Sequence, residues 1–410
     1  MHNNTDEQNS PWLQHDGALR GLRVLDFSRI LSGPFATMTL ADLGADVVKV
    51  EDSGNGDDTR CWGPPYLGDT ASYFLSVNRN KRSVAVDLKE PDGNALVRHL
   101  ARTADVIVEN FRPGTAARLG LGYEQVATDN PGVVYTSISG YGQDGPYSRE
   151  PGYDAVAQAV SGVMSVTGDQ DGQPARVGVS SADLAAGMWA AIGVLAALCE
   201  RDRTGNGQWV DISLLDGQIA WLTYVAGGYF ATGVVPDRYG SAHPTIVPYQ
   251  AFPTAEGHIM IAAGNDRLWR RFATVVGLDR LIDDPRFATN PERVRNRDVL
   301  LPLIEEALAS RTAHEWAKLL ADAAVPAGPI NTVDQALSHP QVTARGMLAA
   351  TEHPSAGTVR TLSSPIKLSE SPVSVRDAPP QHGQHTADVL AGLGVSADRL
   401  EQLQQKGTIR

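Results

Sequence analysis

Residues 22–51 read LRVLDFSRILSGPFATMTLADLGADVVKVE and carry the clearest structural pattern of the chain. The two apolar runs at 22–27 and 46–51 have the length and branched residues of buried strands. Between them a helix is expected at 35–43, because Gly33-Pro34 precedes it and proline is favoured in a first helical turn. A strand, a helix and a strand at this spacing predict a parallel pair joined by a crossover.

The alternation continues to about residue 142, with strands expected at 83–88, 105–109 and 133–138 and a helix at 91–103. We therefore predict an α/β fold with a mostly parallel, doubly wound sheet. Ligands of such sheets bind beyond the carboxyl ends of the strands, which makes the loops at 28–34, 52–60 and 110–114 candidate binding segments. Helices are also expected at 153–166 and 180–203, and a strand at 209–212.

The 410 residues have ordinary globular composition and a formal charge of -12. This charge argues against a nucleic acid or an anionic membrane as partner. The run at 185–199 is too short to cross a bilayer. Two cysteines, Cys61 and Cys199, form neither a disulfide framework nor a zinc spacing, so we expect no metal and a reducing, cytoplasmic compartment.

The composition suggests four segments. The polar residues 1–16 are expected to be a mobile tail and not a signal peptide. A large domain would begin at 17–227, and a smaller α+β domain would follow at 228–330. The proline-rich residues 331–410 would return to the large domain or cross to a partner subunit.

Common motifs of doubly wound folds are missing from the sequence. No G-x-G-x-x-G follows the first strand, no phosphate-binding P-loop is present, and GVSSA at 178–182 lacks the closing glycine of a nucleophile elbow. Asp183, at the start of the helix expected at 180–203, has two readings: a carboxylate that helps to begin the helix, or a nucleophile for an acyl group. The basic run at 78–83 would be either a solvated surface or a phosphate site.

Several ordered stretches resemble the class III coenzyme A transferases, the carnitine and bile-acid CoA-transferase family, from about residue 17 to residue 403. They are LRVLD at 22–26, LGADVVKVE at 43–51, NRNKRS at 78–83, VENFRPG at 108–114, SGYG at 139–142, GYD at 152–154, DLAAG at 183–187, GND at 264–266 and GQHT at 383–386.

This resemblance implies an interlocked homodimer with a Rossmann-like large domain built from both ends of the chain. The family's catalytic aspartate falls on Asp183, which would form an anhydride with the acyl group and then a thioester with CoA. Asp154 would support it. Coenzyme A would be a substrate, with no permanently bound cofactor and no metal.

The family's CoA contacts map onto Ile30, Lys89, Asn110, Arg118 and Leu119. Two positions depart from the family pattern, because Asp52 and Pro151 stand where a studied member has basic residues. The adenine and the 3′-phosphate would then be held differently, by Arg79, Lys81 or Arg82. A tetraglycine loop of that member is replaced by YGSAHP at 239–244, so a substrate loop is expected around Gly240, Ser241 and His243.

The segment HPTIVPYQAF at 243–252 resembles members that use short dicarboxylic acids, such as transfer from succinyl-CoA to glutarate. Arg29, Arg79 and His243 are candidates to hold a second carboxylate. Two alternatives stay open. An α-methylacyl-CoA racemase of the same fold is disfavoured, because Tyr153 occupies the position of its histidine and a tyrosine with pKa ~10 is a poor base. A non-catalytic CoA-binding protein is weakly disfavoured by Asp183.

Overall fold

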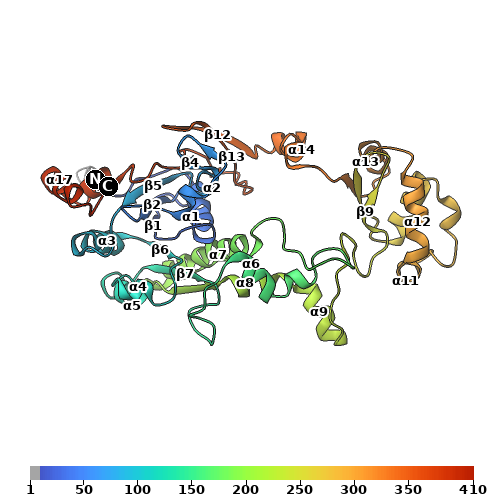
Figure 1. Cartoon of the computed structure of the whole chain (residues 1–410), viewed down its shortest axis with the longest axis horizontal. Helices are drawn as coiled ribbons and strands as arrows, with labels where there is room; N and C mark the ends of the chain where they lie inside the picture. Colours follow the sequence, from blue (N-terminus) through green and yellow to red (C-terminus); the bar gives the residue numbers. More distant parts are fainter. Residues whose placement is uncertain (1–9) are drawn as a thin grey trace. The chain divides into compact units, whose positions relative to one another are not determined.

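A computed structural model describes residues 10–410 and divides them into two compact units (Figure 1). The first unit takes the chain up to Val163, then Val177–Ala226 and Gln341–Arg410. The second takes Met164–Arg176 and Gly227–Pro340. The second unit therefore extends beyond the expected 228–330 at its end and gains a short segment from the first half of the chain.

A six-stranded parallel sheet organises the first unit, which confirms the α/β prediction. Its order is β5-β2-β1-β6-β7-β8, and every adjacent pair is parallel. The strand order reverses between β1 and β6, and this is the point where such sheets open a crevice for ligands. The strands are β1 Arg23–Asp26, β2 Asp46–Glu51, β5 Lys81–Ala85, β6 Val106–Glu109, β7 Val134–Ser139 and β8 Trp209–Ser213.

Helices cover both faces of this sheet, because successive strand side chains point to opposite sides. Val24 and Val47 face one apolar cluster with α1 (Ser32–Asp42) and α7 (Ser181–Thr204). Their neighbours Leu25 and Val48 face another cluster. That second cluster is covered by α3 Pro91–Thr103, α5 Tyr123–Asp129, α16 Thr386–Gly392 and α17 Ala397–Gln405.

The long helix α7 packs closely on α1. A Cβ atom at Gly187 would lie 2.6 Å from the carbonyl oxygen of Ser32, so only glycine allows this approach. With 24 residues, α7 is longer than its apolar run suggested, and by length and composition alone it could cross a membrane. Half of its apolar window is buried inside the protein, as in a core helix.

Two expectations about local structure need correction. Residues 1–9 of the predicted tail lie outside the described residues, but Trp12 is 8% exposed, and its indole N–H donates to the hydroxyl of Thr103 at 2.9 Å. The mobile tail therefore does not reach residue 16. The helix expected at 153–166 is shorter, since α6 spans Asp154–Val160.

The last part of the chain lies against the edge strand β5. Val86 forms a β-bridge with Ile409, and the amide of Asp87 donates to the carbonyl of Thr408 at 2.8 Å. The amide of His385 donates to the carbonyl of Ser83 at 2.9 Å. The sheet of the first unit is therefore completed by residues from both ends of the described chain.

The second unit has its own antiparallel sheet, in the order β11-β10-β9. Its core contains Trp269, Phe272, Leu300 and Trp316, which are all buried. Its elements are β9 Tyr249–Pro253, β10 His258–Ala262, α10 Asp266–Val275, α11 Asn290–Arg295, α12 Arg297–Leu308, α13 Ala313–Asp322, β11 Ala327–Pro329 and α14 Val333–Leu337. The other elements of the chain are β3 Tyr66–Leu67, β4 Thr70–Ala71, α2 Ser72–Val77, α4 Thr115–Arg118, α8 Leu214–Trp221, α9 Thr223–Thr232, α15 Pro340–Ala344, β12 Leu348–His353 and β13 Gly357–Leu362.

Candidate active site

Asp183 lies in the first turn of α7, and Asp154 holds that turn in place. One carboxylate oxygen of Asp154 accepts from the backbone N–H of Ala182 at 2.8 Å, and the other accepts from the amide of Gln158 at 2.8 Å. The side chain of the preceding Ser180 makes no capping hydrogen bond, so the Asp154 carboxylate, from α6, caps the start of α7 instead. Asp154 is thus tied to the position of Asp183 through the helix backbone.

Burial raises the pKa of Asp183 to about 7. The negative charge of Asp154 raises it further in the same direction, whereas a side-chain hydrogen bond with Ser32 lowers it. The Asp183 side chain lines a hollow together with Ile30, Asn110 and Tyr153. A half-buried carboxylate with a strongly shifted pKa inside a hollow is typical of functional sites, and a residue needed only to begin a helix would not require it.

Tyr73 of α2 is a neighbour of this carboxylate that the sequence did not reveal. Burial and the negative charges of Asp183 and Asp154 raise the pKa of Tyr73 to about 12. Its ring meets Trp62 edge to face, with the ring centres 5.6 Å apart. No local pattern could identify Tyr73, because its partners come from distant parts of the chain.

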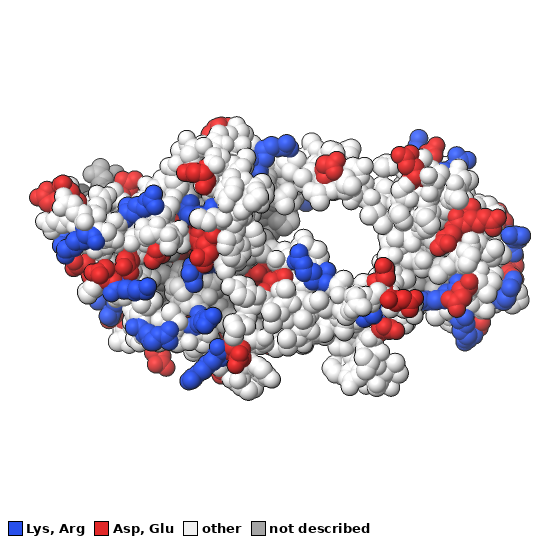
Figure 2. Space-filling view, in the orientation of Figure 1, with Lys and Arg blue, Asp and Glu red and all other residues white. Residues whose placement is uncertain are grey.

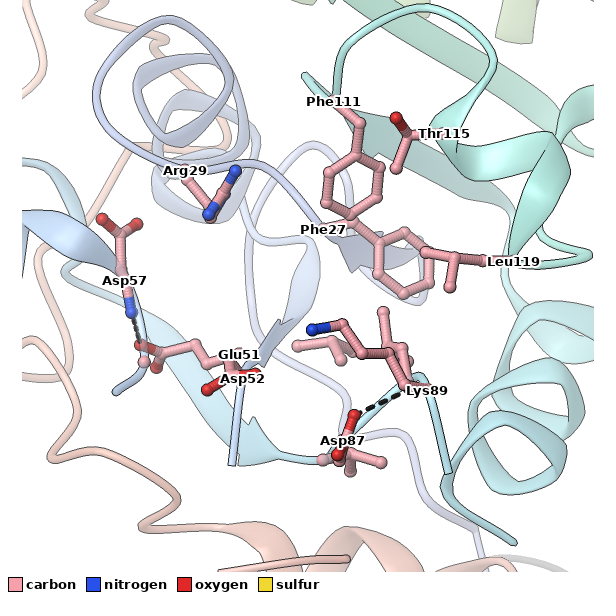
Figure 3. Close-up of a pocket in the computed structure, with 14 residues that line it drawn as sticks. Phe27, Arg29, Glu51, Asp52, Asp57, Asp87, Lys89, Phe111, Thr115 and Leu119 are labelled. Carbon is pink, nitrogen blue, oxygen red and sulfur yellow. Dashed lines mark hydrogen bonds between the residues drawn. The ribbon is translucent and has the colours of Figure 1, made fainter. Parts of the chain in front are cut away.

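A second hollow of about 270 Å³ opens beyond the carboxyl ends of β1 and β2 (Figure 3). Lys89 and Leu119, both predicted CoA contacts, line it, and the ammonium group of Lys89 points into the space. Arg118 is not among the lining residues, but its guanidinium donates to the hydroxyl of Thr115, which is, at 2.8 Å. Asp52 also lines this hollow.

Arg29 and Phe111 line both hollows. They stand at the reversal of strand order, since Arg29 follows β1 and Phe111 follows β6. Arg29 is exposed, and its only ion pair in the described chain is a 3.5 Å contact with Asp58. One extended ligand could therefore run from Lys89 past Arg29 to Asp183.

The basic run at 78–83 is not a solvated surface, and its cations are paired inside the protein. Three carboxylates of neighbouring elements pair with its cations: Asp42 with Arg79, Asp26 with Lys81 and Asp46 with Arg82. Arg79 and Lys81 are buried. These three cations line neither hollow.

The predicted substrate loop belongs to the second unit, whereas the first unit lines both hollows. Gly240 has a φ of +58°, and the hydroxyl of Ser241 accepts from the amide of Ala251 at 3.0 Å. The ring of His243 lies 5.4 Å from that of Tyr249. Among residues 10–410 no group of three or more His, Cys, Asp or Glu side chains is arranged to hold a metal ion.

Comparison with known proteins gives a consistent result. The profile of CoA-transferase family III matches residues 19–386. A succinyl-CoA:glutarate CoA-transferase of Homo sapiens is 43% identical over 91% of this chain and 85% of its own length. An acetyl-CoA:oxalate CoA-transferase of Acetobacter aceti is 42% identical over 86% of this chain and 90% of its own.

A crystal structure of a CAIB/BAIF family protein from Brucella suis superposes with a TM-score of 0.84 at 41% identity. The match covers 92% of this chain and all of that one. The dicarboxylate CoA-transferases are thus among its relatives, and the chain belongs to CoA-transferase family III and is a CoA-transferase.

Proposed function

We propose that this enzyme moves CoA from succinyl-CoA, or a similar short acyl-CoA, to a short dicarboxylic acid through intermediates on Asp183. The observation that carries the proposal is the half-buried Asp183 carboxylate in a hollow that shares Arg29 and Phe111 with the Lys89 hollow. The names of relatives that act on succinyl-CoA, glutarate and oxalate support the substrate class.

Three cations lie where CoA would bind, together with the carboxylates of Asp52 and Asp87, which line the same hollow. Lys89 and Arg29 line the nucleotide end of the proposed path, and Arg118 stands behind Thr115. Phosphate groups bind such side chains through charge-assisted hydrogen bonds. Phe111 and Leu119 give apolar surface for the adenine or the pantetheine arm.

The chemistry would proceed by acyl transfers on one carboxylate. An oxygen of Asp183 attacks the thioester carbonyl, the C–S bond breaks, and CoA leaves as a thiolate, so that the acyl group and Asp183 form a mixed anhydride. The thiolate then attacks the aspartyl carbonyl and releases the donor acid, which leaves CoA on Asp183 as a thioester. The acceptor carboxylate attacks this thioester, the C–S bond breaks, and a second mixed anhydride forms between the acceptor and Asp183 as CoA thiolate leaves. The thiolate then attacks the acceptor's carbonyl in this anhydride, which gives the acceptor's CoA ester and frees the Asp183 carboxylate. Burial leaves the Asp183 carboxylate poorly solvated, which favours its attack.

The homodimer is part of the proposal. Large apolar side chains are exposed on consecutive helices of the first unit, among them Met188 and Ile192 of α7, Trp221 of α8 and Tyr224 of α9. Exposed apolar side chains in this number favour an interaction site on these helices. Light scattering on the purified protein should give the mass of two chains. The free thiols Cys61 and Cys199 fit the proposed reducing, cytoplasmic compartment.

The direct test is a screen of acyl-CoA donors against carboxylic acid acceptors, with Asp183→Asn as the inactive reference. Hydroxylamine added during turnover should mark Asp183 as a hydroxamate, located by mass spectrometry of peptides. A mark on another residue, or full exchange by Asp183→Asn, would contradict the mechanism. Exchange of the α-hydrogen of a 2-methylacyl-CoA without an acceptor acid would indicate the racemase instead.

A further inference from the structure

The turn between β1 and α1 carries an unusual backbone conformation. Ile30 has a φ of +71°, in the left-handed region that β-branched residues seldom adopt. Such strain persists only where surrounding contacts hold it, and it clusters at functional sites. The Ile30 side chain packs beside Leu31, Met38 and Val77, so its position is also fixed by apolar contacts.

Asn110 holds this turn from the neighbouring strand. Its side-chain oxygen accepts from the backbone N–H of Arg29 at 2.8 Å, and its side-chain nitrogen donates to the carbonyl of Arg29 at 2.7 Å. The amide thus satisfies both backbone groups of Arg29, as a further strand residue would. The amide of Phe27 already donates to the carbonyl of Val108, so Asn110 extends the pairing of β1 with β6 beyond the last residue of each strand.

Two other groups support the same turn. Lys49 of β2 donates to the carbonyl of Ser28 at 2.6 Å. The carboxylate of Asp57 accepts from the amide of Ile30 at 3.4 Å and from that of Thr59 at 3.0 Å. These contacts act on either side of Arg29, whose own backbone groups depend on Asn110.

The turn leads directly to the reacting carboxylate. Two residues after Ile30 comes Ser32, the first residue of α1, which lines the same hollow as Asp183. A hydrogen bond from its side chain is one of the influences that lower the pKa of Asp183. We propose that Asn110 is a positioning residue of the reaction, which fixes the strained turn at Ile30 and thereby places Ser32 against Asp183. The inference rests on the proposed role of Asp183 and differs from the expectation that Asn110 contacts CoA.

The test is a double-mutant cycle with Asn110→Ala and Ile30→Gly, since glycine adopts positive φ without strain. Without the Asn110 hydrogen bonds the turn should relax from its strained conformation, and Asn110→Ala should lower kcat. The expected loss is roughly tenfold to hundredfold, because this is the rate factor equivalent to the free energy usually stored in one strained backbone residue. In the Ile30→Gly variant, Asn110→Ala should lower kcat by less than about threefold. Asn110→Ala should change KM for the acyl-CoA little, both in the parent and in the Ile30→Gly variant.

A second readout separates positioning from general damage. Loss of the Ser32 hydrogen bond removes an influence that lowers the pKa of Asp183, so the acidic limb of the kcat profile should move to higher pH in Asn110→Ala. Asn110→Asp should behave like Asn110→Ala, because its second oxygen would face the carbonyl of Arg29. Asn130→Ala is the matched control, since it also removes two hydrogen bonds between an asparagine side chain and the backbone of the first unit but should leave the limb in place.

The inference is overturned if Asn110→Ala raises KM for the acyl-CoA at unchanged kcat, which would indicate a direct CoA contact. It is also overturned if the cost of Asn110→Ala is the same in both Ile30 backgrounds. The rates are measured with any donor and acceptor that the parent enzyme uses. If the proposed substrates are wrong, the parent enzyme itself will not use them in the screen. If only this inference is wrong, the parent will be active and the variants will not show the expected pattern.

Discussion

The pKa of Asp183 makes stability depend on pH in a direction opposite to that of most carboxylates. Folding raises the pKa from 3.8 to about 7, so between these values the native protein binds a proton that the unfolded chain has released. Stability therefore falls as pH rises through this window, by about 1.4 kcal/mol for each pH unit. Over the window of about three units, the total is about 4 kcal/mol.

Asn at position 183 has no charge to bury, so Asp183→Asn should remove this loss. Its free energy of unfolding, relative to the parent, should rise by about 4 kcal/mol between pH 4 and pH 7 and stay constant above pH 7. Urea unfolding at half-unit pH intervals measures the difference, with Asp202→Asn as a control on the exposed side of the same helix. The control should stay within about 0.5 kcal/mol of the parent throughout.

The same carboxylate should set the acidic limb of the reaction, because only its ionised form attacks a thioester. For the free enzyme, kcat/KM should fall tenfold for each pH unit below about 7. A difference between Asp183→Asn and the parent that does not vary with pH would refute the reasoning. So would a limb centred near pH 4, since the carboxylate would then be solvated like an exposed one.

Three further changes test other parts of the site. Asp154→Ala leaves the amide of Ala182 without its acceptor, so urea unfolding should show that the free energy of unfolding falls by about 1–3 kcal/mol. The acidic limb of the kcat/KM profile should move to lower pH, because a negative charge that raises the pKa of Asp183 is removed. A limb that stays in place would show that the Asp154 charge does not act on Asp183. Lys89→Ala should raise KM for the acyl-CoA roughly tenfold or more and weaken its salt dependence, as judged from initial rates; the exposed Lys367→Ala is its control, and equal KM values would exclude the phosphate contact. Lys81→Ala breaks a buried ion pair and should cost about 3–5 kcal/mol of stability; a raised KM with unchanged stability would return Lys81 to the CoA site.

The sheet could be predicted from the sequence, because each buried strand is a short run of branched residues with a recognisable helix beside it. The loops after residues 27 and 109 could also be named as candidate binding segments, but only the observed strand order shows that they flank the switch point between β1 and β6. The strained turn between Ser28 and Ile30 could not, since a positive φ at isoleucine is held by Asn110, Lys49 and Asp57 from other parts of the chain.

The basic run at 78–83 shows why the cations of the site were harder to predict. Local pattern predicts exposure for adjacent Arg and Lys residues, yet their carboxylate partners come from β1, α1 and β2. Which cation stays available for a ligand is decided only when the strands assemble. At Trp12 the sequence did offer a local signal that the mobile-tail prediction overlooked. A single large apolar residue in a polar segment indicates that the segment packs on the protein, and Trp12 is indeed buried.

The composite first unit has a consequence for synthesis on the ribosome. Its β5 edge receives Thr386, whose hydroxyl accepts from the amide of Ala85 at 3.0 Å, and later Ile409, which bridges Val86. Both arrive only after the whole second unit, which ends at Pro340, has been translated. Until then the nascent sheet has an unpaired edge and a partly uncovered apolar face, which are features that recruit chaperones or invite aggregation. Truncated chains ending before residue 341 should therefore be held by chaperones, whereas the full chain is released.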